Sequence, residues 1–288
     1  MGRVVVAGCG YVGEPLADAL HSEGWHVEAW TGSAESVARL ADKPYGVICR
    51  DISQPQARAV PAHLVVQCVS TRGGDAEAYE RLYFQGARNL AAAFPSATLL
   101  FTSSTGVYAQ LNGELVTEES AAEPTRESAW VLRRTEDFVL ARGGIVARLA
   151  AIYGPQRSAW LRKFLRREPI ARPVEDYYVN QIHRDDVVSA LRLLIARRAA
   201  IPGQIFNVVD NDPITSRACY EILATLLDRP LPETATIPPQ LRRGLTNKRV
   251  SNVKLRQLGW HPRFPTFEVG LRESVLRPCP PQVGYESC

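Results

Sequence analysis

Short runs of apolar, β-branched residues alternate with longer segments of helical periodicity over the first 150 residues. This alternation is typical of a parallel sheet covered by helices on both faces. We therefore expect a doubly wound α/β fold of Rossmann type, with right-handed crossovers between its strands. The expected strands are residues 3–7, 26–30, 45–49, 64–69, 97–102 and 144–149. The expected helices are residues 11–22, 34–41, 76–93 and 126–141.

After residue 155 the alternation becomes irregular and prolines cut the chain into short pieces, which indicates a second, smaller lobe. Residues 1–155 are expected to form the sheet domain. It would also receive residues from about 180 to 210, because segment 184–197 has an apolar stripe that suits packing on the sheet. Residues 156–276 would form mainly the second lobe, interleaved with the first. Residues 277–288 contain three prolines, and we expect a loose tail there.

Composition excludes several classes of protein. Hydrophobic residues make up 45% and charged residues 22% of the 288 residues, which fits a globular chain. The net charge of +4 is too small and too dispersed to indicate nucleic acid as the partner. No run of 18 apolar residues suits a membrane span, so we expect a cytoplasmic protein. The six cysteines form no Cys-x-x-Cys pair, which predicts reduced thiols and no metal site.

A glycine-rich loop joins the first expected strand to the first expected helix. Gly8, Gly10 and Gly13 stand in the pattern Gly-x-Gly-x-x-Gly, with Tyr11 and Val12 between the last two. The first glycine permits a tight turn, the second lets backbone approach a pyrophosphate, and the third lets helix and strand pack closely. The position of the loop therefore favours a dinucleotide-binding site over a plain glycine turn.

The end of the second expected strand bears on the choice between NAD and NADP. An NAD-selective site places a carboxylate there, but this chain has Thr31, Gly32 and Ser33. A small hydroxyl-bearing turn leaves room for a 2′-phosphate, which favours NADP. Glu28 is the competing carboxylate, although strand alternation directs it elsewhere. An arginine for the phosphate is missing unless Arg39 or Arg50 folds over the turn.

Asp51 follows the third expected strand, where its carboxylate can bond the adenine amino group or simply cap a helix. Further motifs follow the later strands. In this order the motifs resemble the extended short-chain dehydrogenase/reductase family over nearly the whole chain, and the last resembles its atypical, epimerase-like members. These motifs are Phe101–Tyr108, Arg148–Pro155, Ile182–Val187, Phe206–Val208 and Lys248–Pro262.

The resemblance implies roles for some residues and removes others. Ser104 matches the residue that orients substrate. The family's catalytic Tyr and the Lys four residues later are replaced by Ser128 and Leu132, if Glu136 marks the register. Without these two residues the usual acid/base relay is lost. Tyr108 is a substitute candidate for catalysis, although the matching family residue is mostly structural.

Two further residues are expected near the ligands. Tyr153 matches a family residue near the nicotinamide, often a packing residue, and we expect it in the cofactor site. Arg249 can grip a phosphate or carboxylate of the substrate in a bidentate manner, or remain a surface arginine. Trp160, Trp260 and Phe264 are expected in the core of the second lobe.

Two functions follow. The first is an NAD(P)-dependent oxidoreductase or epimerase acting on a small polar substrate, either nucleotide-sugar-like or a carbonyl compound, with NADP preferred to NAD. The second is an NAD(P)-binding sensor or scaffold that has lost catalysis, which the replacement of the Tyr and Lys favours. Family members often dimerise through the helices matching residues 76–93 and 126–141, which suggests a homodimer.

Overall fold

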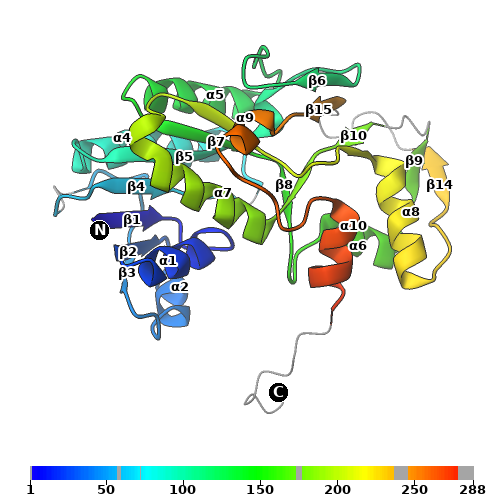
Figure 1. The fold of residues 1–288 in the computed structure, drawn as a ribbon, viewed down its shortest axis with the longest axis horizontal. Helices are drawn as coiled ribbons and strands as arrows, with labels where there is room; N and C mark the ends of the chain where they lie inside the picture. Colours follow the sequence, from blue (N-terminus) through cyan, green and yellow to red (C-terminus); the bar gives the residue numbers. More distant parts are fainter. Residues whose placement is uncertain (1, 57–59, 72, 173–176, 237–245, 278–288) are drawn as a thin grey trace.

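The computed structural model describes residues 2–56, 60–71, 73–172, 177–236 and 246–277 of the chain. Its centre is a parallel sheet of seven strands (Figure 1). All six expected strands are present, with ends that differ from expectation by at most two residues, and the seventh comes from beyond residue 200. The strands are β1 (Arg3–Ala7), β2 (His26–Thr31), β3 (Gly46–Cys49), β4 (Leu64–Gln67), β5 (Thr98–Ser104), β7 (Ile145–Leu149) and β12 (Ile205–Val208).

The strand order is β3-β2-β1-β4-β5-β7-β12, and every neighbouring pair is parallel. The chain winds outward from β1 in one direction and, after β3, returns to β4 and winds in the other. Ligands of such sheets bind above the carboxyl ends of the strands at this reversal. The topology therefore directs attention to the ends of β1 and β4. The doubly wound fold expected from the sequence is confirmed.

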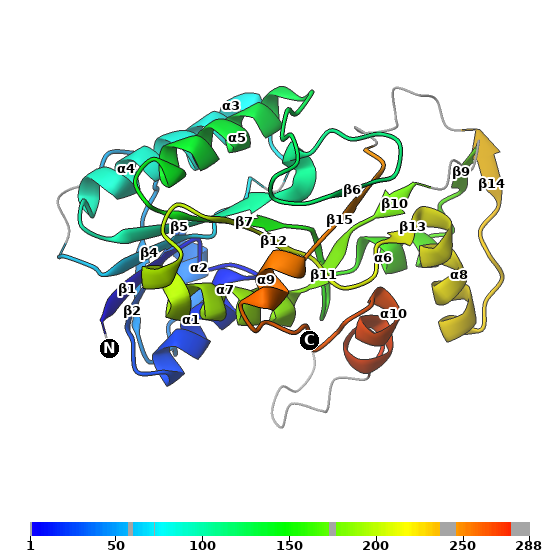
Figure 2. The same cartoon turned by 45° about the horizontal axis from the view of Figure 1, so that its top comes forward.

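Helices cover both faces of the sheet. Figures 1 and 2 show α1 and α7 side by side on one face, and α3, α4 and α5 on the other. The expected helix 184–197 is confirmed to the residue as α7. The helices of this domain are α1 (Gly13–Ser22), α2 (Ala34–Arg39), α3 (Ala76–Tyr79), α4 (Gly86–Ala93), α5 (Glu127–Leu140) and α7 (Arg184–Arg197).

The helix expected over residues 76–93 has a π-helical middle, η1 (Glu80–Gln85), between α3 and α4. The wider turns of a π-helix leave carbonyls poorly matched to the helix's own donors. The fully buried side chain of Gln67, at the end of β4, donates through Nε2 to the carbonyls of Leu82 and Tyr83, at 3.1 and 3.0 Å. The sheet thus stabilises an irregularity that periodicity alone does not reveal.

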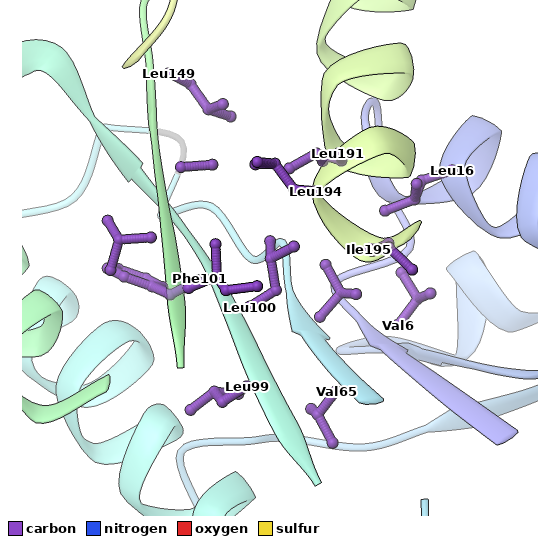
Figure 3. Close-up of a cluster of buried hydrophobic side chains, with 14 of the residues drawn as sticks. Val6, Leu16, Val65, Leu99, Leu100, Phe101, Leu149, Leu191, Leu194 and Ile195 are labelled. Carbon is purple, nitrogen blue, oxygen red and sulfur yellow. The ribbon is translucent and has the colours of Figure 1, made fainter. Parts of the chain in front are cut away.

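The main hydrophobic core lies between the sheet and its helices, as Figure 3 shows for Val6, Leu16, Val65 and Ile195. A smaller core fills the second lobe and includes Phe164, Leu223 and Phe267. Trp260 was expected in that smaller core, but it belongs to the main one, where its Nε1 donates to Ser189 Oγ of α7 at 2.9 Å. This contact explains how the end of the chain returns to the sheet domain.

Short strand pairs build the second lobe and tie it to the first (Figure 2). No helix in the described ranges combines the length and apolar character that a membrane span needs. The remaining elements are η2 (Thr105–Val107), β6 (Glu114–Val116), β8 (Ala151–Tyr153), α6 (Ala159–Leu165), β9 (Ile170–Arg172), β10 (Tyr178–Val179), β11 (Gln181–His183), η3 (Arg198–Ala200), β13 (Ile214–Thr215), α8 (Ser216–Leu227), β14 (Thr234–Thr236), β15 (Lys248–Val250), α9 (Val253–Gln257), α10 (Phe267–Gly270) and η5 (Leu271–Val275).

A buried ion pair joins α5 to β7. Arg148 donates to both carboxylate oxygens of Glu136, through Nε at 3.0 Å and through Nη2 at 2.6 Å. Ser103 Oγ donates to the same carboxylate at 2.6 Å. The side chains of Arg148 and Glu136 are 2% and 0% exposed, so neither charge has water as an alternative partner.

Replacing Glu136 by Ala is expected to lower the free energy of unfolding by about 3–5 kcal/mol, because it leaves the Arg148 charge buried and unpaired. Asp137→Ala is the matched control, since this neighbouring carboxylate is 60% exposed in its pair with Arg133. It should cost less than about 1 kcal/mol. Urea unfolding at neutral pH measures the free energy of unfolding of both variants. Equal losses of stability would contradict the assignment of Glu136 as the buried partner of Arg148.

Candidate functional site

The glycine loop lies at the reversal of strand order. The amides of Gly8 and Cys9 donate to the carbonyl of Trp30 at 3.0 and 2.9 Å, which ties the loop to the end of β2. Gly8 has a φ of +100°, and a Cβ added there would lie 2.6 Å from the backbone of Cys68, just after β4. Only glycine suits this close, left-handed position.

The other two glycines of the loop differ in what surrounds them. A Cβ added at Gly13 would lie 2.2 Å from the carbonyl oxygen of Gly8, so this residue lets α1 pack closely on the loop. A Cβ at Gly10 would meet no atom within 4 Å. Gly10 therefore faces open space at the start of α1, where helix amides favour an anion. The geometry fits a diphosphate at Gly10.

The turn after β2 is organised by its own hydroxyl groups. Thr31 Oγ1 accepts from the amide of Ser33 at 3.3 Å, and Ser33 Oγ caps α2 by accepting from the amide of Ser36 at 3.2 Å. Gly32 between them faces open space, since an added Cβ would meet nothing within 4 Å. Glu28 lies elsewhere, bonded to Arg3 and to Trp30 Nε1, as strand alternation predicted.

Two arginines flank this turn. Arg39 pairs with Glu14 of α1 and brings Nη2 to 3.5 Å from the carbonyl oxygen of Cys9, within the glycine loop. The guanidinium of Arg50 lies 5.7 Å from the ring centroid of Trp30. The backbone amide of Arg50 donates to the Thr31 carbonyl at 2.8 Å. The tertiary structure thus brings positive charge to a turn that lacks it in sequence.

Asp51 is exposed just beyond β3, and its Oδ1 accepts from the amide of Ser53 at 2.9 Å. This bond fixes the carboxyl group in an Asx turn and satisfies one of its two oxygens. Asp51 therefore stands beyond the carboxyl end of β3 with one carboxylate oxygen free of described hydrogen bonds.

Tyr11 connects the glycine loop to the segment that follows β8. Its hydroxyl donates to the carbonyl of Pro155 at 3.0 Å. The guanidinium groups of Arg157 and Arg184 lie 5.0 and 5.2 Å from its ring centroid. Both arginines escaped the sequence-based prediction, because they are distant from Gly13 along the chain.

Ser104 ends β5 and is half-buried. Its Oγ accepts from the amide of Gly106 at 3.0 Å and so caps η2. A Cβ added at Gly106 would lie 3.2 Å from Ser104 Oγ and 3.9 Å from Nη2 of Arg126, the residue before α5. Ser104 Oγ and the Arg126 guanidinium thus both border the space beside Gly106.

Tyr108 is fully buried, and its hydroxyl is occupied. The hydroxyl donates to Asn207 Oδ1 at 2.9 Å and accepts from Arg148 Nη1 at 2.8 Å. Burial raises the pKa of the phenol, which further opposes a catalytic role at neutral pH. The occupied hydroxyl therefore favours a structural role for Tyr108.

Tyr153 lies at the junction of the two lobes, where it is 2% exposed. Its hydroxyl donates to the carbonyl of Thr266 at 3.2 Å, and its ring meets His183 and Phe267 edge-on. These contacts make it a packing residue between β8 and α10. The sequence analysis allowed either a packing role or a cofactor contact for Tyr153. The described contacts support the packing role.

The helix expected to carry the family's catalytic pair is α5. Leu132 is buried and Ser128 half-buried, whereas Glu136 makes the ion pair with Arg148 described above. Neither Leu132 nor Ser128 therefore offers a side chain that can exchange a proton at neutral pH.

Arg249 is exposed on β15, where its Nε donates to the carbonyl of Gly113 at 2.9 Å. Its neighbour Lys248 is buried and was not singled out from the sequence. Side chains alternate along a strand, so Lys248 and Val250 lie on one face of β15 and Arg249 on the other. The apolar Val250 could have indicated from the sequence that this face is buried.

Comparison with known proteins agrees with this geometry. No family model matches the chain. Protein YeeZ of Escherichia coli K12 is 28% identical over 285 residues, which cover 92% of this chain and 97% of YeeZ. The structure of a candidate NAD-dependent epimerase/dehydratase from Methylobacillus flagellatus is 26% identical, with a TM-score of 0.75 over 94% of this chain and 96% of that one.

The chain is similar over most of its length to a structure described as an NAD-dependent epimerase/dehydratase, and its fold is that of such proteins. A UDP-glucose 4-epimerase from Thermus thermophilus, solved in complex with NAD, shares the fold with a TM-score of 0.74 over 94% of this chain and 96% of that one, at 21% identity. At that identity the likeness concerns the fold alone. The likeness to the Methylobacillus flagellatus structure confirms the resemblance inferred from the motifs.

Gly10→Glu is expected to abolish nicotinamide dinucleotide binding, because the new side chain would place a negative charge where the diphosphate must lie. Gly46→Glu is the matched control, since Gly46 also faces open space but lies at the opposite end of the neighbouring strands. Calorimetric titration with NADH and NADPH measures both variants. Retained binding in Gly10→Glu would refute the site.

Proposed function

We propose that this protein is an NAD(P)-dependent oxidoreductase or epimerase acting on a small polar substrate, either a nucleotide-sugar-like compound or another carbonyl compound. The observation that supports this proposal most is the open space at Gly10, at the strand reversal, on the same sheet edge as Ser104. A cytoplasmic location fits this role.

Residues of the first domain would hold the cofactor. The loop Gly8–Gly13, including Tyr11 and Val12, would bind the diphosphate through its amides. Thr31 and Ser33 would face the adenosine ribose, and Asp51 the adenine amino group. Bound there, the nicotinamide supplies hydride transfer, and the protein supplies orientation and a proton source.

We propose a preference for NADP because Arg39 and Arg50 flank the turn that lacks a carboxylate. A 2′-phosphate at Gly32 would offer both arginines a better partner than the 2′-hydroxyl does, since guanidinium groups bind phosphate in charge-assisted pairs. Arg39 would then exchange or share its present partner, Glu14.

Thermal unfolding with NADPH and NADH in parallel tests the preference. A ligand at 100 times its dissociation constant stabilises the folded state by about 2.7 kcal/mol. We expect NADPH to raise the thermal midpoint at lower concentrations than NADH. A response to NADH alone would refute the preference, and no response to either would refute the proposed function.

Arg39→Ala and Arg50→Ala should each weaken NADPH binding about tenfold, equivalent to ~1.4 kcal/mol, and affect NADH little. Arg272→Ala is the matched control, because Arg272 pairs with Glu268 in the second lobe. Equal effects on the two cofactors would show that neither arginine reads the 2′-phosphate.

Ser104 would orient the substrate oxygen beside the nicotinamide. Ser104→Ala is expected to lower kcat about tenfold or more for any carbonyl compound that the protein reduces, with cofactor affinity retained. NADPH oxidation followed by absorbance gives kcat, and calorimetry gives the affinity. Undiminished turnover would remove Ser104 from the mechanism.

Arg249, on β15, would bind an anionic group of the substrate.

Ser128 and Leu132 favour a second candidate function, an NAD(P)-binding sensor or scaffold without turnover. Such a protein would bind the cofactor yet oxidise no NADPH with any carbonyl compound offered.

A homodimer through α3, α4 and α5 is also proposed, and the half-exposed indole of Trp130 on α5 fits such a contact. Sedimentation velocity distinguishes it from a monomer.

A further inference from the structure

Two arginines from the later half of the chain meet the glycine loop at one residue. The guanidinium groups of Arg157 and Arg184 lie 5.0 and 5.2 Å from the ring centroid of Tyr11. Tyr11 directly follows Gly10, which faces open space. Two like charges gathered beside one ring repel each other, and an anion bound near both offsets that repulsion. This position therefore favours an anionic ligand beside the glycine loop.

Most hydrogen-bond donors of these two arginines have no described partner. Arg184 Nε donates to Asp185 Oδ1 at 2.9 Å, and the Arg184 side chain is 25% exposed. No acceptor in the described ranges bonds the Nη groups of Arg184 or the guanidinium of Arg157. A guanidinium group carries five N–H donors in a planar fork that suits phosphate oxygens. Both side chains therefore have donors available for a phosphate.

Arg157 is held by a short turn that follows β8. The amides of Gly154 and Arg157 each donate to the carbonyl of the other, at 2.8 and 3.0 Å. Pro155 stands second in the turn, and Gln156 stands third with a left-handed φ of +61°, which is the pattern of a type II turn. Such a φ is uncommon for a residue other than glycine, and backbone of this kind gathers at binding sites. The turn fixes the backbone from which Arg157 reaches Tyr11.

Gly154 shows how closely the three segments approach one another. A Cβ added there would lie 2.8 Å from the hydroxyl oxygen of Tyr11 and 3.2 Å from Cβ of Arg184. Gly154 also has a φ of +153°. The glycine loop, the turn and the start of α7 thus form one packed junction, so packing determines where both guanidinium groups stand relative to the loop.

The backbone of the glycine loop offers further donors at this junction. The amides of Gly8 and Cys9 are bonded to the carbonyl of Trp30. By contrast, the amides of Tyr11 and Val12 donate to no acceptor in the part of the chain that the structure describes. Free amides at the start of a helix such as α1 bind phosphate groups. The diphosphate of a dinucleotide carries one negative charge on each phosphate, which two guanidinium groups match.

We propose that Arg157 and Arg184 bind the diphosphate of the nicotinamide cofactor, so that one phosphate site is completed by segments far apart in the chain; this inference rests on the proposed function. The loop amides would bond one side of the diphosphate and the guanidinium groups the other. Arg39 and Arg50 are proposed to bind the 2′-phosphate, which only NADP has. Arg157 and Arg184 would instead serve NAD and NADP alike, because both contain the diphosphate.

Arg157→Gln and Arg184→Gln test the proposal, because glutamine keeps part of the side-chain stem and removes the charge. Calorimetric titration gives the affinities for NADPH, for NADH and for their nicotinamide-free fragments, 2′-phospho-ADP-ribose and ADP-ribose. We expect each variant to lose about tenfold in affinity for every ligand that the unaltered protein binds, since a charge-assisted hydrogen bond to phosphate is removed. The variants of Arg39 and Arg50 should differ by affecting the ligands with a 2′-phosphate only.

Matched controls remove an arginine from the same two parts of the fold. Arg162→Gln alters an exposed arginine of α6, and Arg192→Gln alters an arginine of α7 that pairs with Glu23. Both should leave all the affinities unchanged. A loss in these controls equal to that in Arg157→Gln and Arg184→Gln would show that net charge alone is responsible, and would overturn the proposal.

The dependence of affinity on salt separates phosphate binding from a structural role. Added sodium chloride should weaken cofactor binding less steeply in Arg157→Gln and Arg184→Gln than in the unaltered protein, because a screened charge pair has been removed. Lower affinity with the same salt dependence would overturn the proposal, and so would unchanged affinity for the nicotinamide-free fragments. Failure of the unaltered protein to bind either cofactor would instead refute the proposed function, and this proposal with it.

Discussion

The buried pairing of Arg148 with Glu136 constrains the sheet at β5 and β7, where the proposed substrate site lies. Two opposite charges without water must be bonded on every side, or their desolvation is not offset. Ser103 and the hydroxyl of Tyr108 supply these further bonds, and Tyr108 in turn donates to Asn207. The network therefore links β5, β7, β12 and α5 to one another through buried hydrogen bonds.

The site inherits its geometry from this network. Ser104 follows the bonded Ser103 directly, so its hydroxyl leaves the sheet at a fixed point. Tyr108 anchors the other end of the same short segment, and its carbonyl holds the ammonium of Lys248. Tyr108, which resembles a catalytic candidate in sequence, thus makes contacts that support the fold.

Open backbone and positive charge distinguish the edge of the sheet around the glycine loop. Gly10 and Gly32 face empty space, whereas Gly8 and Gly13 are required by close contacts within the protein. The first pair leaves room for a ligand, and the second pair holds the loop against β4 and α1. Arginines reach the same edge from α2, from β3 and from the second lobe beside Tyr11. The arginines from all three of these places would attract an anionic dinucleotide.

The sequence by itself determined the doubly wound sheet, its strands and the glycine loop, because periodicity and turn residues act locally. It also placed Ser104 at the strand end. Only the tertiary structure decided which polar groups meet, since such contacts join segments far apart in the chain. For that reason the contacts of Tyr108 and Tyr153 favour packing roles, and Trp260 belongs to the main core. Burial of a charge depends on what every neighbouring element contributes, which no local pattern records.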